Sequence, residues 1–255
     1  MAYPAPPRRL VLASASPARL RLLQGAGFEP EVIVSGVDED GFEAADLPAL
    51  VTALAQAKAE SVAARPEAAG AVVVACDSLL DVDGEAHGKP TGEAEARARL
   101  QRLRGRSAIL RTGHCVIDTL TGRRAGGAAA TEVVFGRFSD AELDAYVASG
   151  EPLLVAGAFT LDGRFAPFVD RIVGDHGNVI GLSLPLFRVR SELSLDERAD
   201  AGAQRFMFGR EDRRPDLGLR EHVEILAGEA SALGQTRIIE DEAVFVERNV
   251  RAEGA

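Results

Sequence analysis

The chain has 255 residues, 46% of them hydrophobic, and its net charge is −10. This acidic balance argues against binding to nucleic acid through bulk positive charge, and no apolar run approaches the roughly 20 residues that span a bilayer, so neither partner is expected. Two cysteines argue against a disulfide framework and the N-terminal residues lack the apolar core of a secretory signal, so the expected location is the cytoplasm.

Strand-like and helix-like segments alternate over residues 8–193, which predicts an α/β sheet protein. β-Branched runs predict the strands, and apolar residues at helical spacing predict the helices. In chain order we expect a strand at 8–12, a helix at 17–25, a strand at 30–37, a helix at 47–66, a strand at 71–80, a helix at 93–103, strands at 108–122 and 128–138, a helix at 139–150, and then short strands, a loop and a final helix.

The composition changes beyond residue 193. Residues 194–255 are acidic, and only 217–233 and 236–247 suggest a helix and a strand. We therefore predict one domain at 1–193 and an acidic C-terminal extension at 194–255, whose role the sequence does not indicate.

Two serines and an arginine stand where the first predicted strand passes into the first helix. A helix N-terminus offers unpaired N–H groups and a partial positive charge, which suit a phosphate. Ser14 and Ser16 add hydroxyl groups, and Arg19 in the first turn can bind phosphate oxygens in a bidentate manner. An ordinary helix cap is the alternative, and these residues alone slightly favour it.

Carboxylates follow two of the predicted strands. Asp77 comes after a five-residue apolar run, at the carboxyl end of its strand, where open α/β sheets hold ligands. Such an acid can bind Mg²⁺ or take a proton from water, although a strand-terminating turn is the alternative. The acidic residues at 38–40 could hold a hard cation, but a solvated turn is favoured there.

Lysine is rare in this chain. Only Lys58 and Lys89 are lysines among 29 basic residues, and the rest are arginines. The two lysines are therefore candidates for positions that need a compact ammonium group rather than a planar guanidinium. From composition alone, it is equally plausible that the two lysines lie on the surface by chance and have no special role. With Arg19 they would supply three cations for a polyphosphate.

Several stretches, in order between residues 8 and 190, resemble the Maf family of nucleoside triphosphate pyrophosphatases; among them are "LASASPARLRLLQGAGFEPEV", "VVVACDSLLDVDGEAHGKP" and "FVDRIVGDHGNVIGLSLPL". The resemblance implies a mixed α/β fold, with a strongly twisted sheet and two lobes around a cleft, similar to the inosine triphosphate pyrophosphatases. It implies hydrolysis of a nucleoside triphosphate substrate to the monophosphate and pyrophosphate, with Mg²⁺ or Mn²⁺ as cofactor. A homodimer is also expected.

The resemblance assigns roles to individual residues of this chain. The family's catalytic carboxylate matches Asp77, and Glu39 matches its second acidic position, so both are predicted metal ligands. The predicted phosphate-binding residues are Ser14, Ser16, Arg19, Lys58 and Lys89. The prediction for Ser16 comes only from its place at the start of a helix, and the other four match family positions. Both lysines thus fall at family site positions, which favours function over chance.

Three positions linked to base choice depart from the subfamilies that prefer dTTP and UTP. Those carry Arg, Thr and Gln where this chain has Ala18, Ser78 and Asp162. Because a base contact changes preference when its donors and acceptors change, we expect an altered or broader base preference. Asp162 would favour a base that offers an amino or imino donor, unless it faces solvent.

A second hypothesis is a non-catalytic nucleotide-sensing protein that acts in septum formation and division control, with residues 194–255 as a docking surface. Maf relatives have been linked to that process. The retained acid favours the enzyme, because a protein that only binds nucleotides does not need Asp77.

Overall fold

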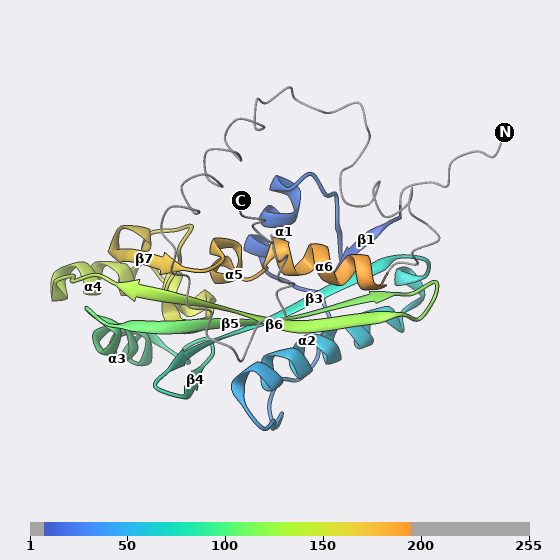
Figure 1. The fold of residues 1–255 in the computed structure, drawn as a ribbon. Coiled ribbons are helices and arrows are strands. Elements are labelled where there is room, and N and C mark those ends of the chain that lie inside the picture. Colours follow the sequence, from blue (N-terminus) through green and yellow to red (C-terminus); the bar gives the residue numbers. More distant parts are fainter. Residues whose placement is uncertain (1–7, 195–255) are drawn as a thin grey trace, which may run out of the picture. The chain divides into compact units, whose positions relative to one another are not determined.

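The structure is a computed structural model that describes residues 8–194 (Figure 1). The predictions for 217–233 and 236–247 lie outside these residues. The strands are β1 (Leu10–Leu12), β2 (Glu31–Val32), β3 (Val72–Val82), β4 (Glu85–His87), β5 (Ser107–Asp118), β6 (Arg124–Phe135) and β7 (Val169–Val173). The α-helices are α1 (Pro17–Gly25), α2 (Leu47–Ala63), α3 (Glu93–Leu103), α4 (Asp140–Ala148), α5 (His176–Ile180) and α6 (Leu184–Ser194). In this part of the chain no helix has the length and apolarity to cross a membrane.

The seven strands form one mixed sheet, as expected. Its order is β2-β1-β3-β5-β6-β7, and β4 pairs with β3 off this path. The pairs of β1 with β2 and with β3 are parallel, and all the others are antiparallel. The mixed α/β class predicted from the sequence is therefore confirmed.

Two strands differ from their predicted bounds for physical reasons. The strand predicted at 30–37 is only two residues long, because its partner β1 ends at Leu12 and pairing stops there. The short strand β4 was not predicted, since three residues carry little periodic signal. It forms because Asp83 and Gly84, both with positive φ, turn the chain back onto β3 in a hairpin.

Helices cover both faces of the sheet around β1 and β3 (Figure 1). Side chains alternate along a strand, so Val74 and Cys76 pack with α1 and α6 on one face. Val73 and Ala75 pack against α2 on the other face. By the same alternation Asp77 points toward α2.

A third apolar cluster lies at the other end of the long strands. It joins Leu80 of β3 and Phe135 of β6 to α3, α4 and the turns that follow α4. Phe165 packs against several rings of this cluster, with the ring centroids of Phe138, Tyr146 and Phe168 between 4.9 and 5.4 Å away. The described residues thus form two lobes, one around β1, α1 and α2 and one around β4, α3 and α4.

The two lobes meet at an interruption in one edge of β3. The strand pairs with β5 along nearly its whole length on one side. On the other side β1 pairs with residues 72–74 and β4 with residues 80–82. No strand in the described part of the chain pairs with that edge between Ala75 and Leu79. We call this interval the β3 gap.

Candidate active site

Asp77 lies in the β3 gap rather than at the end of its strand. The prediction that it stands at the carboxyl end of β3 is wrong, because the strand continues to Val82 along β5 and β4. Asp77 does lie beyond the end of the parallel neighbour β1, whose last paired residue faces Val74. The interruption between two partners, not the end of the strand, gives side chains from elsewhere access to this position.

A buried ammonium group joins the two predicted acids. Lys58 of α2 forms an ion pair with Asp77 Oδ1, and its Nζ lies 2.7 Å from Glu39 Oε1. Lys58 and Asp77 are only 8% and 5% exposed, whereas Glu39 is exposed. The structure therefore brings these three predicted residues together. Asp38 and Asp40 have no contact with Lys58 and remain an exposed turn.

The ionisation of Asp77 reflects its burial. Burial raises the pKa of Asp77 above the ordinary value of 3.8, and the charge of Lys58 offsets this only in part. A carboxyl group with a raised pKa is a better proton acceptor than an exposed aspartate. The environment of Asp77 is thus suited to a general base.

Arg19 is held on the opposite side of the β3 gap by three different acceptors. Its Nε donates to the carbonyl oxygen of Gly181 at 2.8 Å. Its Nη1 and Nη2 donate to Ser14 Oγ and Ser78 Oγ, each at 3.0 Å. These three contacts fix the orientation of the guanidinium, whose positive charge acts on Asp77.

The two serines of the first loop have different roles in the structure. Ser14 is buried and contacts Arg19, and its Oγ also accepts from the backbone N–H of Ser16 at 3.2 Å. Ser16 is the N-cap of α1, with its Oγ 3.4 Å from the backbone nitrogen of Arg19. The sequence left two roles open for this serine, helix cap and phosphate contact. In the structure Ser16 is the helix cap.

Ser78 stands with Arg19 and not with the other two base-choice candidates. Its hydroxyl is 3.0 Å from Thr112 Oγ1 on β5, and Thr112 Oγ1 donates to the carbonyl oxygen of Asn178 at 3.1 Å. Sequence reasoning missed Thr112 and Gly181. An isolated threonine in a strand carries no signal, and a backbone carbonyl has no residue signature.

His114 completes this buried polar layer. Its Nε2 accepts from the N–H of Ser183 at 2.8 Å, and its Nδ1 lies 3.0 Å from the carbonyl oxygen of Thr112. An accepting Nε2 requires the neutral ring with the proton on Nδ1. Burial lowers the pKa of His114 from 6.5 to about 3, so the ring stays neutral at physiological pH.

The buried histidine predicts how stability depends on pH. Because the pKa of His114 is about 3 when folded and 6.5 when unfolded, its contribution is complete above pH 6.5 and is lost as the pH falls toward 3. We expect the free energy of unfolding to drop across this window by a few kcal/mol, on the order of 1.4 kcal/mol per shifted unit. Urea unfolding at several pH values measures it. His114→Gln should show a flatter profile, and an equal slope in the variant would contradict the assignment.

Lys89 is set apart from the other cations. It lies in the loop between β4 and α3, is exposed, and forms no hydrogen bond or ion pair within residues 8–194. The antiparallel register pairs Leu80 with His87, so the chain leaves β4 in the direction of Ser78 and Asp77. The loop therefore brings Lys89 toward the β3 gap, with its ammonium unpaired.

The remaining candidates line one cavity of about 290 Å³. Ala18 and Asp162 both border it, together with Arg21, Leu22, Ile180 and Leu184. Asp162 Oδ2 accepts from Arg21 Nη2 at 3.1 Å, a contact that sequence reasoning did not foresee. The cavity thus has a guanidinium, supplied one helical turn after Ala18, next to an acidic acceptor.

Glu39 and Asp77 fit a divalent cation as ligands. Carboxylate oxygens are what Mg²⁺ prefers, and the two side chains converge on one ammonium group, so their oxygens already face a common point. Within residues 8–194 no group of three or more His, Cys, Asp or Glu side chains is arranged to hold a metal ion. Mg²⁺ is commonly bound by one or two carboxylates together with substrate phosphates, which matches this set.

Together, fold and site define a mixed α/β protein with acidic, basic and hydroxyl side chains gathered at an interrupted strand. The model of the Maf-like protein family matches residues 9–194, and the chain belongs to this family.

Its relatives include bacterial proteins named nucleoside triphosphate pyrophosphatase. The protein of Streptomyces coelicolor is 63% identical over 185 residues, covering 72% of this chain and 90% of the relative. Those of Streptomyces avermitilis and Salinispora tropica are 62% and 52% identical, covering 72% and 74% of this chain and 89% and 85% of theirs.

Proposed function

We propose that the chain hydrolyses nucleoside triphosphates to the monophosphate and pyrophosphate. The observation that carries this proposal is the buried ion pair of Asp77 with Lys58 in the β3 gap, together with Arg19, which is bound to Ser78, the next residue of the same strand. The activity named for the relatives supports the same conclusion. In the cell this activity would remove nucleotides or adjust the sizes of their pools.

The cations are suited to the charge of a triphosphate. Arg19 presents a planar guanidinium, which binds phosphate oxygens in a bidentate manner, and its three protein acceptors hold it in place. Lys58 and Lys89 add compact ammonium groups. Charge that develops on the leaving pyrophosphate would be stabilised by groups already oriented toward it.

Asp77 is suited to accept the proton of the attacking water. Water adds to the α-phosphorus, its proton passes to Asp77, and the bond between the α-phosphorus and the bridging oxygen breaks, so that pyrophosphate leaves. The ion pair with Lys58 orients this carboxylate.

Glu39 and Asp77 would hold the divalent cation. Bound Mg²⁺ or Mn²⁺ would neutralise the phosphates and polarise the α-phosphoryl group. Lys58 lies between the two acids, so its ammonium group would have to give up at least one of these two contacts when the cation binds.

Release of pyrophosphate from a panel of ordinary and modified nucleoside triphosphates tests the proposal. Each nucleotide would be incubated with Mg²⁺, with Mn²⁺ and with a chelator. Pyrophosphate and monophosphate in equal amounts, lost on chelation, are expected. Tight nucleotide binding without release from any nucleotide would overturn the enzymatic function, and release that resists chelation would overturn the cofactor.

Base preference should respond to Asp162. Asp162→Gln restores the side chain found in the dTTP- and UTP-preferring subfamilies and frees Arg21 from its ion pair. We expect kcat/KM for dTTP and UTP, relative to the best nucleotide of the wild type, to rise about tenfold, the scale of one base-edge contact. Unchanged ratios across the panel would show that the base does not reach the cavity beside α1.

The homodimer implied by the family resemblance remains a prediction, and so does the cytoplasmic location expected from the cysteine content and the N-terminal residues. Sedimentation of the full chain at several concentrations tests the first of them.

A further inference from the structure

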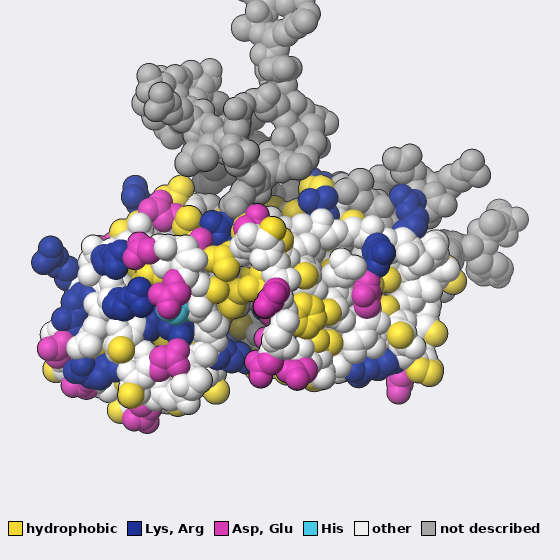
Figure 2. All heavy atoms as spheres, turned by 90° about the horizontal axis from the view of Figure 1, so that it is seen from below, with side chains coloured by type: hydrophobic (Ala, Val, Ile, Leu, Met, Phe, Trp, Pro, Cys, Tyr) yellow, Lys and Arg dark blue, Asp and Glu magenta, His cyan; other side chains and the backbone are white. Residues whose placement is uncertain are grey.

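The surface over α3 and β4 carries basic and acidic side chains next to one another (Figure 2). Most of these pairs are exposed, such as Arg97 with Asp144 and Arg106 with Asp83. Exposed pairs contribute little to stability. Arg99, on the same helix, is different, because only 7% of its surface is exposed.

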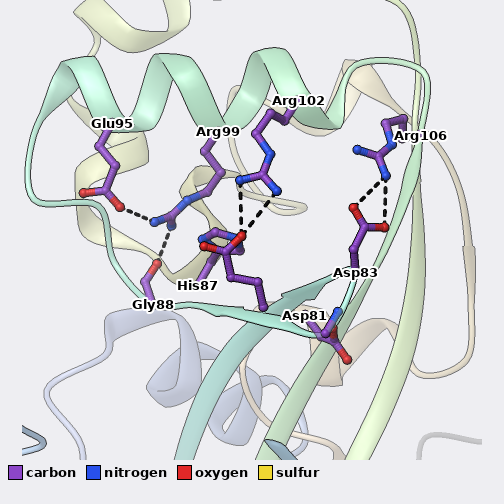
Figure 3. Close-up of polar contacts among 10 residues, drawn as sticks. Asp81, Asp83, His87, Gly88, Glu95, Arg99, Arg102 and Arg106 are labelled. Carbon is purple, nitrogen blue, oxygen red and sulfur yellow. Dashed lines mark hydrogen bonds and ion pairs between the residues drawn. The ribbon is translucent and has the colours of Figure 1, made fainter.

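Arg99 connects a backbone carbonyl to a carboxylate. Its Nη1 donates to the carbonyl oxygen of Gly88 at 2.6 Å, and its Nη2 pairs with Glu95 Oε1 one turn earlier on α3 (Figure 3). Burial of the guanidinium lowers the pKa of Arg99, so the surroundings resist its charge. A buried arginine is costly unless its charge is paired and hydrogen-bonded; here Glu95 pairs the charge, and Gly88 accepts a further hydrogen bond.

Glu95 extends this connection to the far end of the same loop. Its second oxygen, Oε2, accepts from the backbone N–H of Thr91 at 2.8 Å and from Thr91 Oγ1 at 2.7 Å. The backbone N–H of Gly157 also donates to the carbonyl oxygen of Gly88 at 3.1 Å. Gly88 and Thr91 are therefore both tied down, one on each side of Lys89.

Only Lys89 and Pro90 lie between these two anchors. Pro90 is buried, and a residue that precedes proline is restricted to extended conformations. The backbone of Lys89 thus has little freedom, while its ammonium group forms no hydrogen bond or ion pair within the described residues. The network therefore fixes the backbone on both sides of Lys89 and leaves its ammonium group unpaired.

We propose that Arg99 and Glu95 are positioning residues for Lys89: by anchoring Gly88 and Thr91 to α3, they direct the free ammonium toward phosphates bound in the β3 gap. The proposal rests on the proposed function, since Lys89 acts on the phosphates only if the site binds them. The hydrogen bonds of Arg99 go to Gly88 and Glu95, and none goes to Asp77 or Lys58.

A double-mutant cycle separates this role from simple packing. We expect Arg99→Met to lower kcat/KM for pyrophosphate release about tenfold, since small displacements of binding groups cost up to about a hundredfold. Combined with Lys89→Met, the same change should have less than about a twofold effect. Arg99→Lys, which reaches only one of the two acceptors, should fall between wild type and Arg99→Met. Arg97→Met is the matched control on α3 and should leave kcat/KM unchanged.

Equal losses from Arg99→Met with and without Lys89 would overturn the proposal, because Arg99 would then matter only for packing. If Arg99→Met does not fold, Glu95→Gln replaces it in the cycle, since this variant keeps the side-chain size and weakens both anchors.

Amide hydrogen exchange in the 88–92 loop gives a readout that does not need activity. We expect exchange at Thr91, whose N–H donates to Glu95, to become at least tenfold faster in Arg99→Met and to stay unchanged in Arg97→Met. Unchanged exchange in Arg99→Met would refute the anchoring. A wild type that releases no pyrophosphate but shows the expected exchange would refute the proposed function and leave the anchoring intact.

Discussion

Asp77→Asn is expected to lower kcat/KM for pyrophosphate release by between about 10² and 10⁴, the usual contribution of a general base. Asparagine has nearly the same shape but neither takes a proton nor offers a charged ligand to a cation. The loss should appear mainly in kcat, because Arg19 keeps all three of its acceptors and continues to bind phosphate. Steady-state kinetics with the best nucleotide of the panel measures it.

Asp118→Asn is the matched control. Asp118 is also a buried aspartate paired with an arginine, Arg8, but it lies at the far end of β5. Its replacement should lower stability and leave kcat/KM within about twofold, as expected for a change outside the site. If Asp77→Asn kept more than a tenth of wild-type activity, Asp77 could not be the base, and its burial with Lys58 would be structural.

Gly113→Ala is expected to destabilise the protein by about 3 kcal/mol and to disturb the site, because it forces α2 away from β5. Gly113 pairs with Asp77 across the sheet. A Cβ at this position would lie 2.0 Å from the carbonyl oxygen of Val51 and 2.6 Å from the backbone nitrogen of Thr52. Backbone atoms in a helix cannot yield by a rotamer change, so the whole helix must move.

The same helix carries Lys58, so a shift of α2 should also lower kcat/KM about tenfold or more. Urea unfolding and the pyrophosphate assay on the same preparation measure both effects. Gly25→Ala is the control for stability only, because a Cβ there meets no atom within 4 Å, although Gly25 borders the cavity beside α1. Wild-type stability in Gly113→Ala would mean that α2 does not pack this closely on the sheet.

The long elements could be predicted from the sequence, because their signals are local. The apolar run of β3 and the helical spacing of α2 both appear where expected. β2 could not be bounded in this way, since its length depends on how far β1 extends beside it. The position of Asp77 within β3 was missed for a similar reason: an apolar run shows where a strand is buried, not where its neighbours end.

The grouping of Lys58, Asp77 and Glu39 was foreseen, but through the family resemblance rather than through spacing. Nothing in the local sequence of α2 indicates that one lysine faces an acid in the middle of the sheet. The residues that position the site without binding substrate, Gly113 and Thr112, could not be predicted from the sequence. Gly113 acts by the absence of a side chain, and Thr112 acts through a hydroxyl that looks like any other strand threonine.

The β3 gap also has a consequence for the order in which the chain assembles. One border of the gap, the β3–β4 hairpin, joins near neighbours such as Leu80 and His87 and forms quickly. The other border pairs Leu10 with Val72, which requires closing a long loop and is slower. Asp77 is thus flanked on both sides only in the completely folded chain. A nucleotide that needs both borders binds that state alone, so the melting temperature should rise with nucleotide concentration.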